Sequence, residues 1–427
     1  MTFATAPQQI AALSQLSAVG TVTAIALLAP AVAPISAQAQ ITPDGMLGSE
    51  SSTVTEGAIV QGDLADLIEG GAIRGGNLFH SFLEFNVGEG QRVYFANPAT
   101  IENILSRVTG GDPSNILGTL GVDGPANLFF LNPNGIVFGP EATLDITGSF
   151  HASTADAIAI GEGVYSATNP EQSSLLTVDP SIAFTNYLSD ESGDITNQGQ
   201  LAAQGDLTLA ANNLDLQGQV EAGGELTLLG IDTVQIRDTA DVPFVGFAGS
   251  DLLVQGNEQV DIVALSHPDS GLYSYGDMVL RSANPAGGDA HYFSGGSFRV
   301  ETLNGEVGDL YSPIDPIIRS QGDVEIGFYS GASLHILAGG SVSLNSGGII
   351  APDPGVAGVD FLQETITLSD GTVIQIDGGA QPTLDVRAGV DPAVIGAIPV
   401  PNPPVFFRRS VYKSAINPQV PTSMWLL

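Results

Sequence analysis

One short pattern recurs along the middle of this sequence: a glycine, a polar or charged residue, and then two apolar residues that flank a third residue. Its copies begin at Gly205 and Gly224, at Gly276 and Gly296, and at Gly322 and Gly340. The members of each pair therefore lie about 20 residues apart, which is the repeat length of a solenoid built from short strands. Shorter apolar pairs, such as Leu214 with Leu216 and Val234 with Ile236, fall between the copies.

A strand of this length cannot bury its apolar face alone, so the copies must stack on one another. A coil of about 20 residues that turns at glycines predicts an all-β parallel β-helix, in which each strand pairs with the coils above and below. The competing architecture is a β-sandwich of antiparallel hairpins. Its turns recur every 8–12 residues without a three-strand register, so the β-helix is favoured.

Composition and charge restrict the function further. The chain has 11 basic and 46 acidic residues, a formal net charge of −35, which disfavours binding to nucleic acid or to an anionic membrane surface. A weaker interpretation of the acidity is low-affinity Ca²⁺ association through scattered carboxylates. Cysteine is absent and Lys413 is the only lysine, which excludes disulfides, thiolate metal sites and a P-loop.

Residues 1–39 have the features of a cleavable signal peptide. Residues 24–29 form an apolar centre, and Ala37-Gln38-Ala39 is a small-x-small cleavage pattern, which predicts a mature chain that starts at Gln40. The usual positive charge near the N-terminus is missing. Pro30 and Pro34 interrupt the apolar stretch, so a membrane-spanning helix is not expected.

The segment Asn132-Pro133-Asn134-Gly135-Ile136 lies between two apolar runs, 128–131 and 136–138. Asn132 can close an Asx turn, Pro133 presets φ, and Gly135 supplies a positive φ. The segment is therefore predicted to be a tight corner between two buried strands. Taken alone, it is an ordinary turn that sets strand register.

Several ordered blocks around this corner resemble the N-terminal domain of the filamentous haemagglutinin family, the secretion domain of two-partner secretion (TPS) exoproteins. The blocks are residues 76–82, 85–87, 107–118, 126–139, 148–150 and 152–156, and they include Asn77, Leu78, Phe79, His80, Phe82, Arg107, Val108, Gly110, Ser153 and Thr154. A second short family motif, Asn-Pro-Asn-Leu, is not present.

The resemblance implies a right-handed, single-stranded β-helix with an N-terminal capping region and extra-helical β elements. It also implies that residues 132–136 form a secretion motif read by the periplasmic POTRA-type domains of an outer-membrane transporter. The protein would then be secreted or held at the cell surface, after passing the periplasm and outer membrane, with an adhesin-like role. It would be monomeric and bind no cofactor.

The expected domains are the signal peptide 1–39, a TPS secretion domain 40–189, a β-helix extension 190–378 and a Pro-rich tail 379–427. Within the tail, six prolines make residues 382–404 an extended spacer that cannot enter a sheet interior. Two local expectations concern the secretion domain: inward-facing alternation of Leu83, Phe85 and Val87 and of Val93 and Phe95, and a short helical turn over 101–105. The last twenty residues hold Arg408, Arg409 and Lys413, and members of the resembled family are usually much longer, so the chain is interpreted as a truncated or frameshifted member.

Candidate catalytic groups are sparse. The five histidines show no metal-type spacing, and no G-x-S-x-G motif occurs. The alternative function is a β-helical polysaccharide-degrading hydrolase or lyase, with Asp206, Asp215 and Asp232 as the candidate acid and base residues. Because aspartates at corners usually cap turns, we expect a structural exoprotein and not an enzyme.

Overall fold

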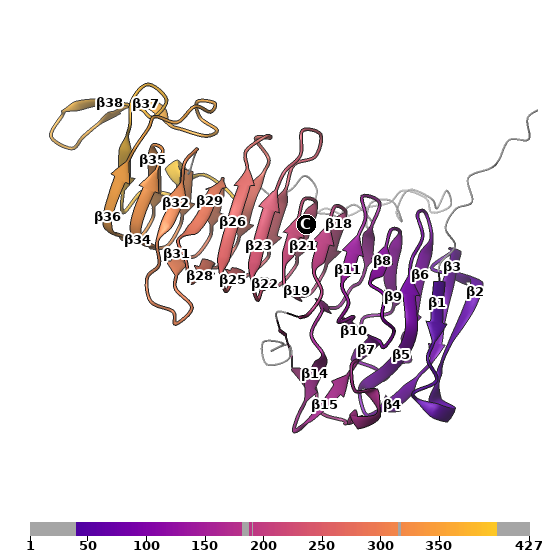
Figure 1. The fold of residues 1–427 in the computed structure, drawn as a ribbon. Coiled ribbons are helices and arrows are strands. Elements are labelled where there is room, and N and C mark those ends of the chain that lie inside the picture. The colour runs from indigo at the N-terminus through magenta and orange to yellow at the C-terminus, as the bar shows by residue number, and fades with distance from the viewer. Residues whose placement is uncertain (1–39, 182–187, 190, 315–316, 399–427) are drawn as a thin grey trace, which may run out of the picture. The chain divides into compact units, whose positions relative to one another are not determined.

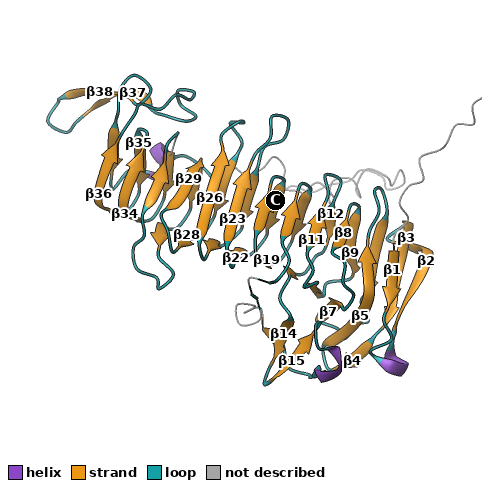
Figure 2. Ribbon diagram, in the orientation of Figure 1, coloured by secondary structure: helices purple, strands orange, loops and turns teal. Residues whose placement is uncertain are grey.

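The computed structural model describes residues 40–181, 188–189, 191–314 and 317–398. The predicted signal peptide and residues 399–427 of the predicted tail lie outside these ranges. The described residues are almost entirely strands, turns and loops (Figure 2). No helix among them is long and apolar enough to cross a membrane.

The strands form three parallel ladders, and successive coils add one strand to each (Figure 1). The first ladder contains β5 (Asn77–Asn86), β7 (Asn103–Val108), β10 (Asn127–Leu131), β13 (Phe150–Ser153), β19 (Leu207–Ala211), β22 (Leu226–Gly230), β25 (Leu252–Gly256), β28 (Met278–Ser282), β31 (Phe298–Glu301), β34 (Val324–Gly331) and β36 (Val342–Ile349). The second contains β8 (Ser114–Ile116), β11 (Ile136–Phe138), β17 (Ile195–Asn197), β20 (Leu214–Leu216), β23 (Thr233–Arg237), β26 (Gln259–Ala264), β29 (Ala286–Ala290), β32 (Leu310–Ser312) and the C-terminal halves of β34 and β36.

The third ladder contains β3 (Asp63–Gly70), β6 (Arg92–Ala96), β9 (Thr119–Asp123), β12 (Thr143–Asp145), β18 (Gln200–Ala203), β21 (Gln219–Ala222), β24 (Val245–Ala248), β27 (Gly271–Ser274), β30 (Tyr292–Ser294), β33 (Ile317–Ser320), β35 (Leu334–Ala338) and β39 (Leu384–Arg387). All successive pairs in the three ladders are parallel. The all-β parallel β-helix is therefore confirmed, and the antiparallel sandwich is excluded.

The register matches the sequence repeats. Leu207 pairs with Leu226, Met278 with Phe298, and Val324 with Val342. The inward side chains stack into one continuous core, and the members of its first column from Leu207 to Val324 are buried. Each coil thus buries its apolar face against its neighbours, as a solenoid requires.

The polar residue after the corner glycine has a structural role of its own. The Asp206 Oδ1 atom accepts the backbone N–H of Glu225 in the next coil at 2.9 Å, and Asp277 Oδ1 accepts that of Ser297 at 2.7 Å. Asp323 Oδ1 accepts the N–H of Ser341 at 2.6 Å. In each case the acceptor belongs to the earlier coil and fixes the register of the later one.

Antiparallel strands cover the N-terminal end of the β-helix. β1 (Gln40–Pro43) and β4 (Ala72–Arg74) pair antiparallel with β5, β2 (Ser52–Val60) pairs antiparallel with β3, and a 3₁₀ turn (Gly48–Glu50) joins β1 to β2. Because β3 also pairs in parallel with β6, this cap continues the third ladder.

The chain leaves the β-helix after β13 and returns at β17. The excursion contains β14 (Ala157–Ile160), β15 (Gly163–Ser166), a 3₁₀ turn (Pro170–Gln172) and β16 (Pro180–Ser181), which form a small antiparallel sheet (Figure 1). Its apolar side chains pack on the outward residues Phe79, Leu105 and Phe129 of the first ladder. This sheet is an extra-helical β element of the kind that the resemblance implied.

Two local predictions in the N-terminal region were wrong. Residues 103–108 form strand β7 and not a helical turn, because they pair with β5 and β10 on both sides. Leu83 is exposed although Phe85, Val87, Val93 and Phe95 are buried. The pairing of β1 with β5 shifts between Thr42 and Pro43, so one extra residue in β5 reverses the side-chain alternation at this point.

The predicted spacer over 382–404 was also partly wrong. A proline-free stretch allows β39 to pair with β35 at the edge of the third ladder. Before it, β37 (Gln363–Thr367) and β38 (Val373–Asp377) form a hairpin, and after it comes the short helix α1 (Pro392–Ile395). Ile395 and Ile398 then pack on the outward face of the third ladder.

Candidate functional site

The predicted corner at residues 132–136 connects β10 of the first ladder to β11 of the second. Asn132 is fully buried, and its Oδ1 accepts the backbone N–H of Asn134 at 3.0 Å, which is the predicted Asx turn. Gly135 has φ of 121°, and its N–H donates to the carbonyl of Asn132 at 3.2 Å. Ile136 then enters the core. Local residue chemistry therefore builds this corner as expected.

Neighbouring coils hold the corner from both sides. The Asn132 Nδ2 donates to the Asp112 carbonyl at 3.1 Å and to Ser114 Oγ at 3.0 Å in the preceding coil. In the following coil, the Gly193 N–H donates to the Pro133 carbonyl at 2.7 Å. A Cβ on Gly193 would lie 2.4 Å from the backbone of Asn134, so a glycine is needed there. The corner is thus a packed layer and not a free loop.

Asn134 is the part of the corner that faces solvent. Its side chain is exposed, yet its Nδ2 donates to the Gly110 carbonyl at 2.7 Å. Gly110 itself has no room for a side chain, because a Cβ would lie 2.1 Å from the Leu83 carbonyl. The exposed amide is therefore held in one orientation by the coil beneath it.

A row of asparagines begins the first ladder and ties the excursion to it. The Asn127 Nδ2 donates to Asn103 Oδ1 at 3.0 Å, and Asn103 Nδ2 donates to Asn77 Oδ1 at 3.1 Å. Asn77 Nδ2 in turn donates to the carbonyls of Leu176 and Val178 at 3.0 and 2.7 Å. Asn77 therefore fastens the excursion to the β-helix, a role its neighbours in sequence did not indicate.

Arg107 is a buried and extensively hydrogen-bonded side chain of the family-like blocks. It is only 1% exposed, and its guanidinium donates to Ser81 Oγ at 2.8 Å and to the Ser166 carbonyl at 2.6 Å. It also donates to Ser173 Oγ at 2.5 Å and lies 4.3 Å from the centre of the Tyr165 ring. A buried cation requires several partners of this kind. Arg107 thus joins the first ladder to the excursion.

The other residues of the block 76–82 lie on the two faces of β5, one towards the core and one towards the excursion. Leu78 and Phe82, with Val108 opposite, face the core, whereas Phe79 faces outward and packs edge-on against Tyr165 at 5.0 Å between ring centres. Burial raises the pKa of the Tyr165 hydroxyl, which donates to the His80 carbonyl at 2.7 Å.

His80 is a packed core histidine. Its Nδ1 lies 2.9 Å from Ser52 Oγ, and its ring packs beside Phe82 and Phe95. Burial lowers the pKa of the imidazole to about 3, so the ring is neutral at physiological pH. No group of three or more His, Cys, Asp or Glu side chains in the described ranges has the geometry of a metal site.

Ser153 and Thr154 mark the point where the excursion departs. The Ser153 Oγ accepts the N–H of Ala155 at 3.0 Å, and the Thr154 N–H still bonds to the Ala210 carbonyl of the following coil at 3.0 Å. The last strand residue thus turns the chain outward while the coil above stays in register.

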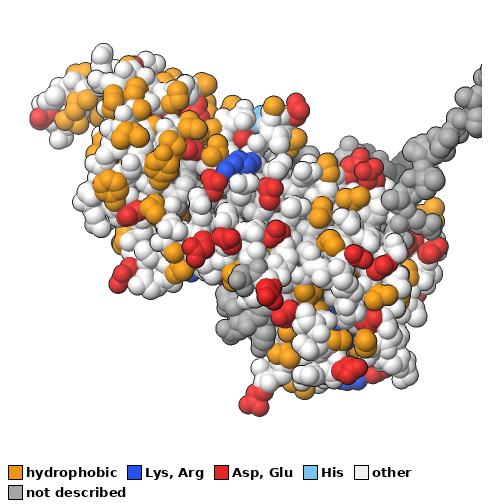
Figure 3. Space-filling view, viewed as in Figure 1, with side chains coloured by type: hydrophobic (Ala, Val, Ile, Leu, Met, Phe, Trp, Pro, Cys, Tyr) orange, Lys and Arg blue, Asp and Glu red, His pale blue; other side chains and the backbone are white. Residues whose placement is uncertain are grey.

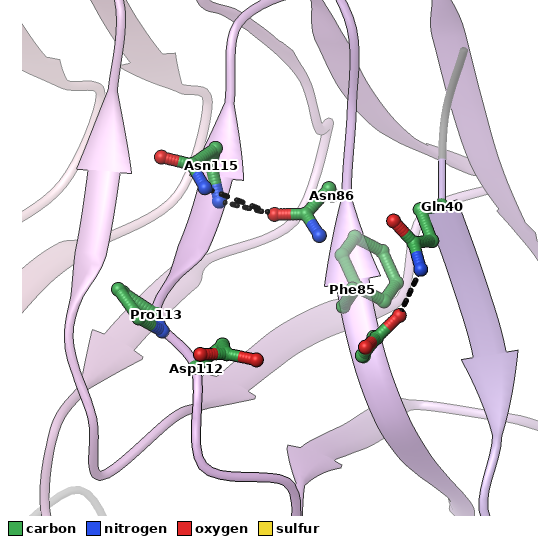
Figure 4. A pocket seen from close by; sticks show the side chains of 7 residues that line it. Gln40, Phe85, Asn86, Asp112, Pro113 and Asn115 are labelled. Carbon is green, nitrogen blue, oxygen red and sulfur yellow. Dashed lines mark hydrogen bonds between the residues drawn. The ribbon is translucent and has the colours of Figure 1, made fainter. Parts of the chain in front are cut away.

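A polar pocket of about 280 Å³ adjoins the corner (Figure 4). It is lined by Gln40, Glu84, Phe85, Asn86, Asp112, Pro113 and Asn115. Asn115 donates to Asn86 Oδ1 through both its backbone and its side chain, at 2.9 and 3.2 Å. Since the Asp112 carbonyl also accepts from Asn132, the pocket wall and the corner share one segment of backbone.

The three aspartates considered for catalysis serve separate local roles. Asp206 accepts the N–H of Glu225 at a corner, and Asp232 accepts from the Thr233 hydroxyl at 3.2 Å. Asp215 lies within β20 and accepts from the Gln217 amide at 3.4 Å. These are strand and turn contacts, and they do not describe a paired acid and base.

Sequence reasoning missed the partners of these residues in the excursion, such as Tyr165, Ser166 and Ser173, and also Gly193 above the corner. One signal was available. Phe150 and Leu207 pair in adjacent coils, yet they are much farther apart in the sequence than the roughly 20 residues that separate equivalent positions of other coils. This wide spacing indicates an inserted segment between them.

Together these features define a β-helix whose first coils are capped, tied to an extra-helical sheet and stacked around a buried Asn-Pro-Asn-Gly corner. The TPS secretion domain family matches residues 39–300, more than half of the chain. The protein therefore belongs to the TPS secretion domain family, the secretion domain of two-partner secretion exoproteins.

Individual relatives are distant. The heme/hemopexin-binding protein of Haemophilus influenzae is 30% identical over 121 residues, which is 28% of this chain and 11% of that protein. The HMW1 secretion domain from Haemophilus influenzae is 14% identical with a TM-score of 0.37, over 72% of this chain and 98% of that one. The filamentous hemagglutinin secretion domain is 17% identical with a TM-score of 0.31, over 74% and 98%.

Proposed function

We propose that this protein is a secreted exoprotein whose N-terminal domain directs its export through a partner outer-membrane transporter and nucleates the β-helix. The observation that carries this proposal is the corner at 132–136. Its buried amide, Asn132, joins this coil to the preceding one, and the Pro133 carbonyl joins it to the following one. Its exposed amide, Asn134, is held in one orientation at the surface. A folded marker of this kind suits recognition by the periplasmic domains of a transporter.

The β-helix supplies a reason for export without a nucleotide. Each new coil buries its apolar pair on the coil before it, so folding outside the cell opposes movement back through the pore. The absence of cysteine also suits a chain that stays extended while it threads the outer-membrane pore, because a disulfide formed in the oxidising periplasm would obstruct it. In this scheme residues 1–39 are removed by signal peptidase after Ala39, and the protein reaches the medium or the cell surface as a monomer.

The test is a secretion assay in cells that carry the chain with its transporter. The Asn134→Ala variant removes the exposed amide and is expected to reduce the amount exported at least tenfold while the purified chain still folds. The Asn132→Ala variant is expected to reduce both export and stability, because it leaves buried partners unpaired.

Asn197 provides a matched control. It is also buried, and its Oδ1 accepts the N–H of Gly199 at 3.0 Å in a second Asx turn, between β17 and β18. Asn197→Ala should lower stability without lowering export to the level of Asn134→Ala. Equal export of the Asn134→Ala variant and the unaltered chain would overturn the role of the corner.

An adhesin-like role at the cell surface rests on the family resemblance, and so does the absence of enzymatic activity. Both have simple tests. Cells that export the chain should adhere to host cells more than cells that lack the transporter, and the purified chain should leave a panel of acidic and neutral polysaccharides intact. Cleavage of any of them would identify the alternative hydrolase or lyase function.

A further inference from the structure

The outward side chains of the second ladder change in character towards its C-terminal end. One column of outward positions runs through successive coils, because each of its members pairs with the next. Its earlier members are polar or charged and include Asp215, Gln235 and Asp261. Its later members are small or aromatic, namely Gly287, Tyr311, Ser330 and Gly348. The column thus carries no charge over these later coils.

Two aromatic rings are exposed on this part of the second ladder. Tyr311 is 47% exposed and Phe328 is 44% exposed, and the only other exposed aromatic side chain in the described ranges is Tyr275, which follows β27 of the third ladder. Phe328 lies two residues before Ser330, the partner of Tyr311, so the two rings project from the same face of adjacent strands. With strands about 4.8 Å apart and alternate residues about 6.6 Å apart, their Cβ atoms lie about 8 Å from each other.

Hydrogen bonds fix the backbone beneath both rings. The Phe328 N–H donates to Asp309 Oδ1 at 2.7 Å. Beside Tyr311, the Ser312 Oγ donates to Asp289 Oδ1 at 2.6 Å, and the Ser312 carbonyl accepts the hydroxyl of the buried Tyr329 at 3.2 Å. Rings carried on such a rigid backbone lose little freedom when a ligand binds.

The fold does not require a glycine at position 348. Apart from its chain neighbours, a Cβ on Gly348 would have no heavy atom within 4 Å, and its φ lies outside the left-handed region. A glycine inside a strand weakens the strand and often marks a place where a ligand approaches closely. Gly287 and Gly348 lie on the two sides of the pair formed by Tyr311 and Ser330, so the surface beside the Tyr311 ring is flat.

The surrounding surface is uncharged. Residues 326–352 include no Asp, Glu, Lys or Arg, although such residues make up 13% of the whole chain. Apolar side chains accordingly gather over the C-terminal coils on the face shown in Figure 3. Ser330, and Ser346 opposite Phe328, place hydroxyl groups among them. The result is a flat, uncharged face with two rings and hydroxyl groups.

We propose that Tyr311 and Phe328, with the glycines and serines beside them, bind an uncharged polysaccharide. A sugar ring has an apolar C–H face that stacks on an aromatic ring, and a rim of hydroxyls that hydrogen-bonds to groups such as Ser330 and Ser346. The net charge of −35 repels an acidic polysaccharide. Glycines beside the rings reduce the apolar area, which favours a sugar over an apolar protein surface.

This surface lies beyond residues 39–300, the part of the chain that matches the secretion domain family. It would serve the adhesin-like role and takes no part in export. Binding is measured on the purified chain, so a failure to bind is distinct from a failure of export.

Electrophoresis in native gels that contain a polysaccharide tests the proposal, because a chain of this charge migrates well. At least one of a β-glucan, a mannan, a xylan and dextran should retard the chain, and Tyr311→Ala with Phe328→Ala should weaken that binding at least tenfold. Tyr275→Ala, at an exposed tyrosine outside this surface, is the matched control and should bind as the unaltered chain does. Retardation by none of the four, retardation only by polygalacturonate, or equal binding by the double variant would overturn the proposal.

Adding a side chain beside the rings gives a second test that removes no contact. Gly348→Val should keep the thermal unfolding temperature, since its Cβ enters open space, but should weaken polysaccharide binding at least tenfold by blocking the flat approach to Tyr311. Ser343→Val introduces the same side chain at an exposed position of β36 opposite Glu325, away from the rings, and should leave binding unchanged. Equal binding by the Gly348→Val and Ser343→Val variants would overturn the proposal.

Discussion

The two ends of the β-helix cover their outermost core layer in different ways. At the N-terminal end, antiparallel strands β1 to β4 close over the first coil, so the core residue Ile68 is completely buried. At the C-terminal end, the described residues leave Leu384 and Val386 partly open. A solenoid coil is stable between two neighbours, so the first coil needs a dedicated cap before any other coil can add to it. Residues 40–74, which precede the family-like blocks, supply that cap.

Truncation of an inward-facing side chain should give the largest difference in stability loss between the two ends. Leu128→Ala removes a fully buried side chain of β10 and is expected to lower the free energy of local opening by about 3–5 kcal/mol. Leu384→Ala, at a half-open position, should cost about 1 kcal/mol or less. Hydrogen exchange of the surrounding strands measures both values. Similar losses would show that the C-terminal layer is covered as fully as the first.

Two arginines, one towards each end of the β-helix, give a second comparison of the two ends. Arg107→Leu breaks several bonds between the first ladder and the excursion and is expected to cost about 3 kcal/mol, with faster exchange over residues 157–181. Arg387, near the other end, pairs with Asp385 and Glu364 at 2.7 and 2.5 Å but is partly open to solvent. Arg387→Leu should therefore cost about 1 kcal/mol. A larger loss of unfolding free energy for Arg387→Leu than for Arg107→Leu in denaturant unfolding would contradict this comparison.

Acid should weaken the N-terminal end. The folded pKa of His80 is about 3, below the ordinary value of 6.5, so the unfolded chain binds this proton more readily than the folded one. The stability it contributes is complete above pH 6.5 and is lost at about 1.4 kcal/mol per pH unit as the pH falls towards 3. A His80→Gln variant should show a shallower loss of N-terminal protection over this range. If N-terminal protection falls with pH equally steeply in His80→Gln, His80 is not the source of the acid sensitivity.

A pH effect of the opposite sign is expected at the other end. Burial raises the pKa of Asp353 to about 6 from 3.8, so the folded chain holds this proton more firmly. Its contribution to stability is complete below pH 3.8 and declines as the pH rises through 6. Protection of residues 350–362 should fall slightly over this range in the unaltered chain and stay level in Asp353→Asn. A rise with pH would contradict this assignment.

Much of the fold was predictable because it repeats. Leu207 and Leu226, or Met278 and Phe298, carry the same local pattern at nearly constant spacing, and stacking is the only way for such strands to bury that pattern. The coils that begin at Leu226 and Leu252 were harder to relate, since the chain between β23 and β24 is longer. Spacing alone does not distinguish a longer loop from a missing coil.

The site was predictable only where its chemistry is local. The Asx turn of Asn132 depends on its immediate neighbours, so the sequence indicated it. The partners of Arg107 come from the excursion, and Leu83 lies at a bulge that depends on pairing with β1. Interactions between segments distant in sequence have no local signature, which is why these features emerged only from the structure.

The side-chain oxygens at the coil corners have a consequence for how such proteins change in length. Because Asp206 offers its acceptor to Glu225, and Glu225 heads a unit of the same design, a tandem duplication of about one coil would supply its own acceptor and its own apolar pair. Neighbouring coils would meet the same surface as before. Lengthening by duplication therefore needs no compensating substitutions elsewhere in the ladder.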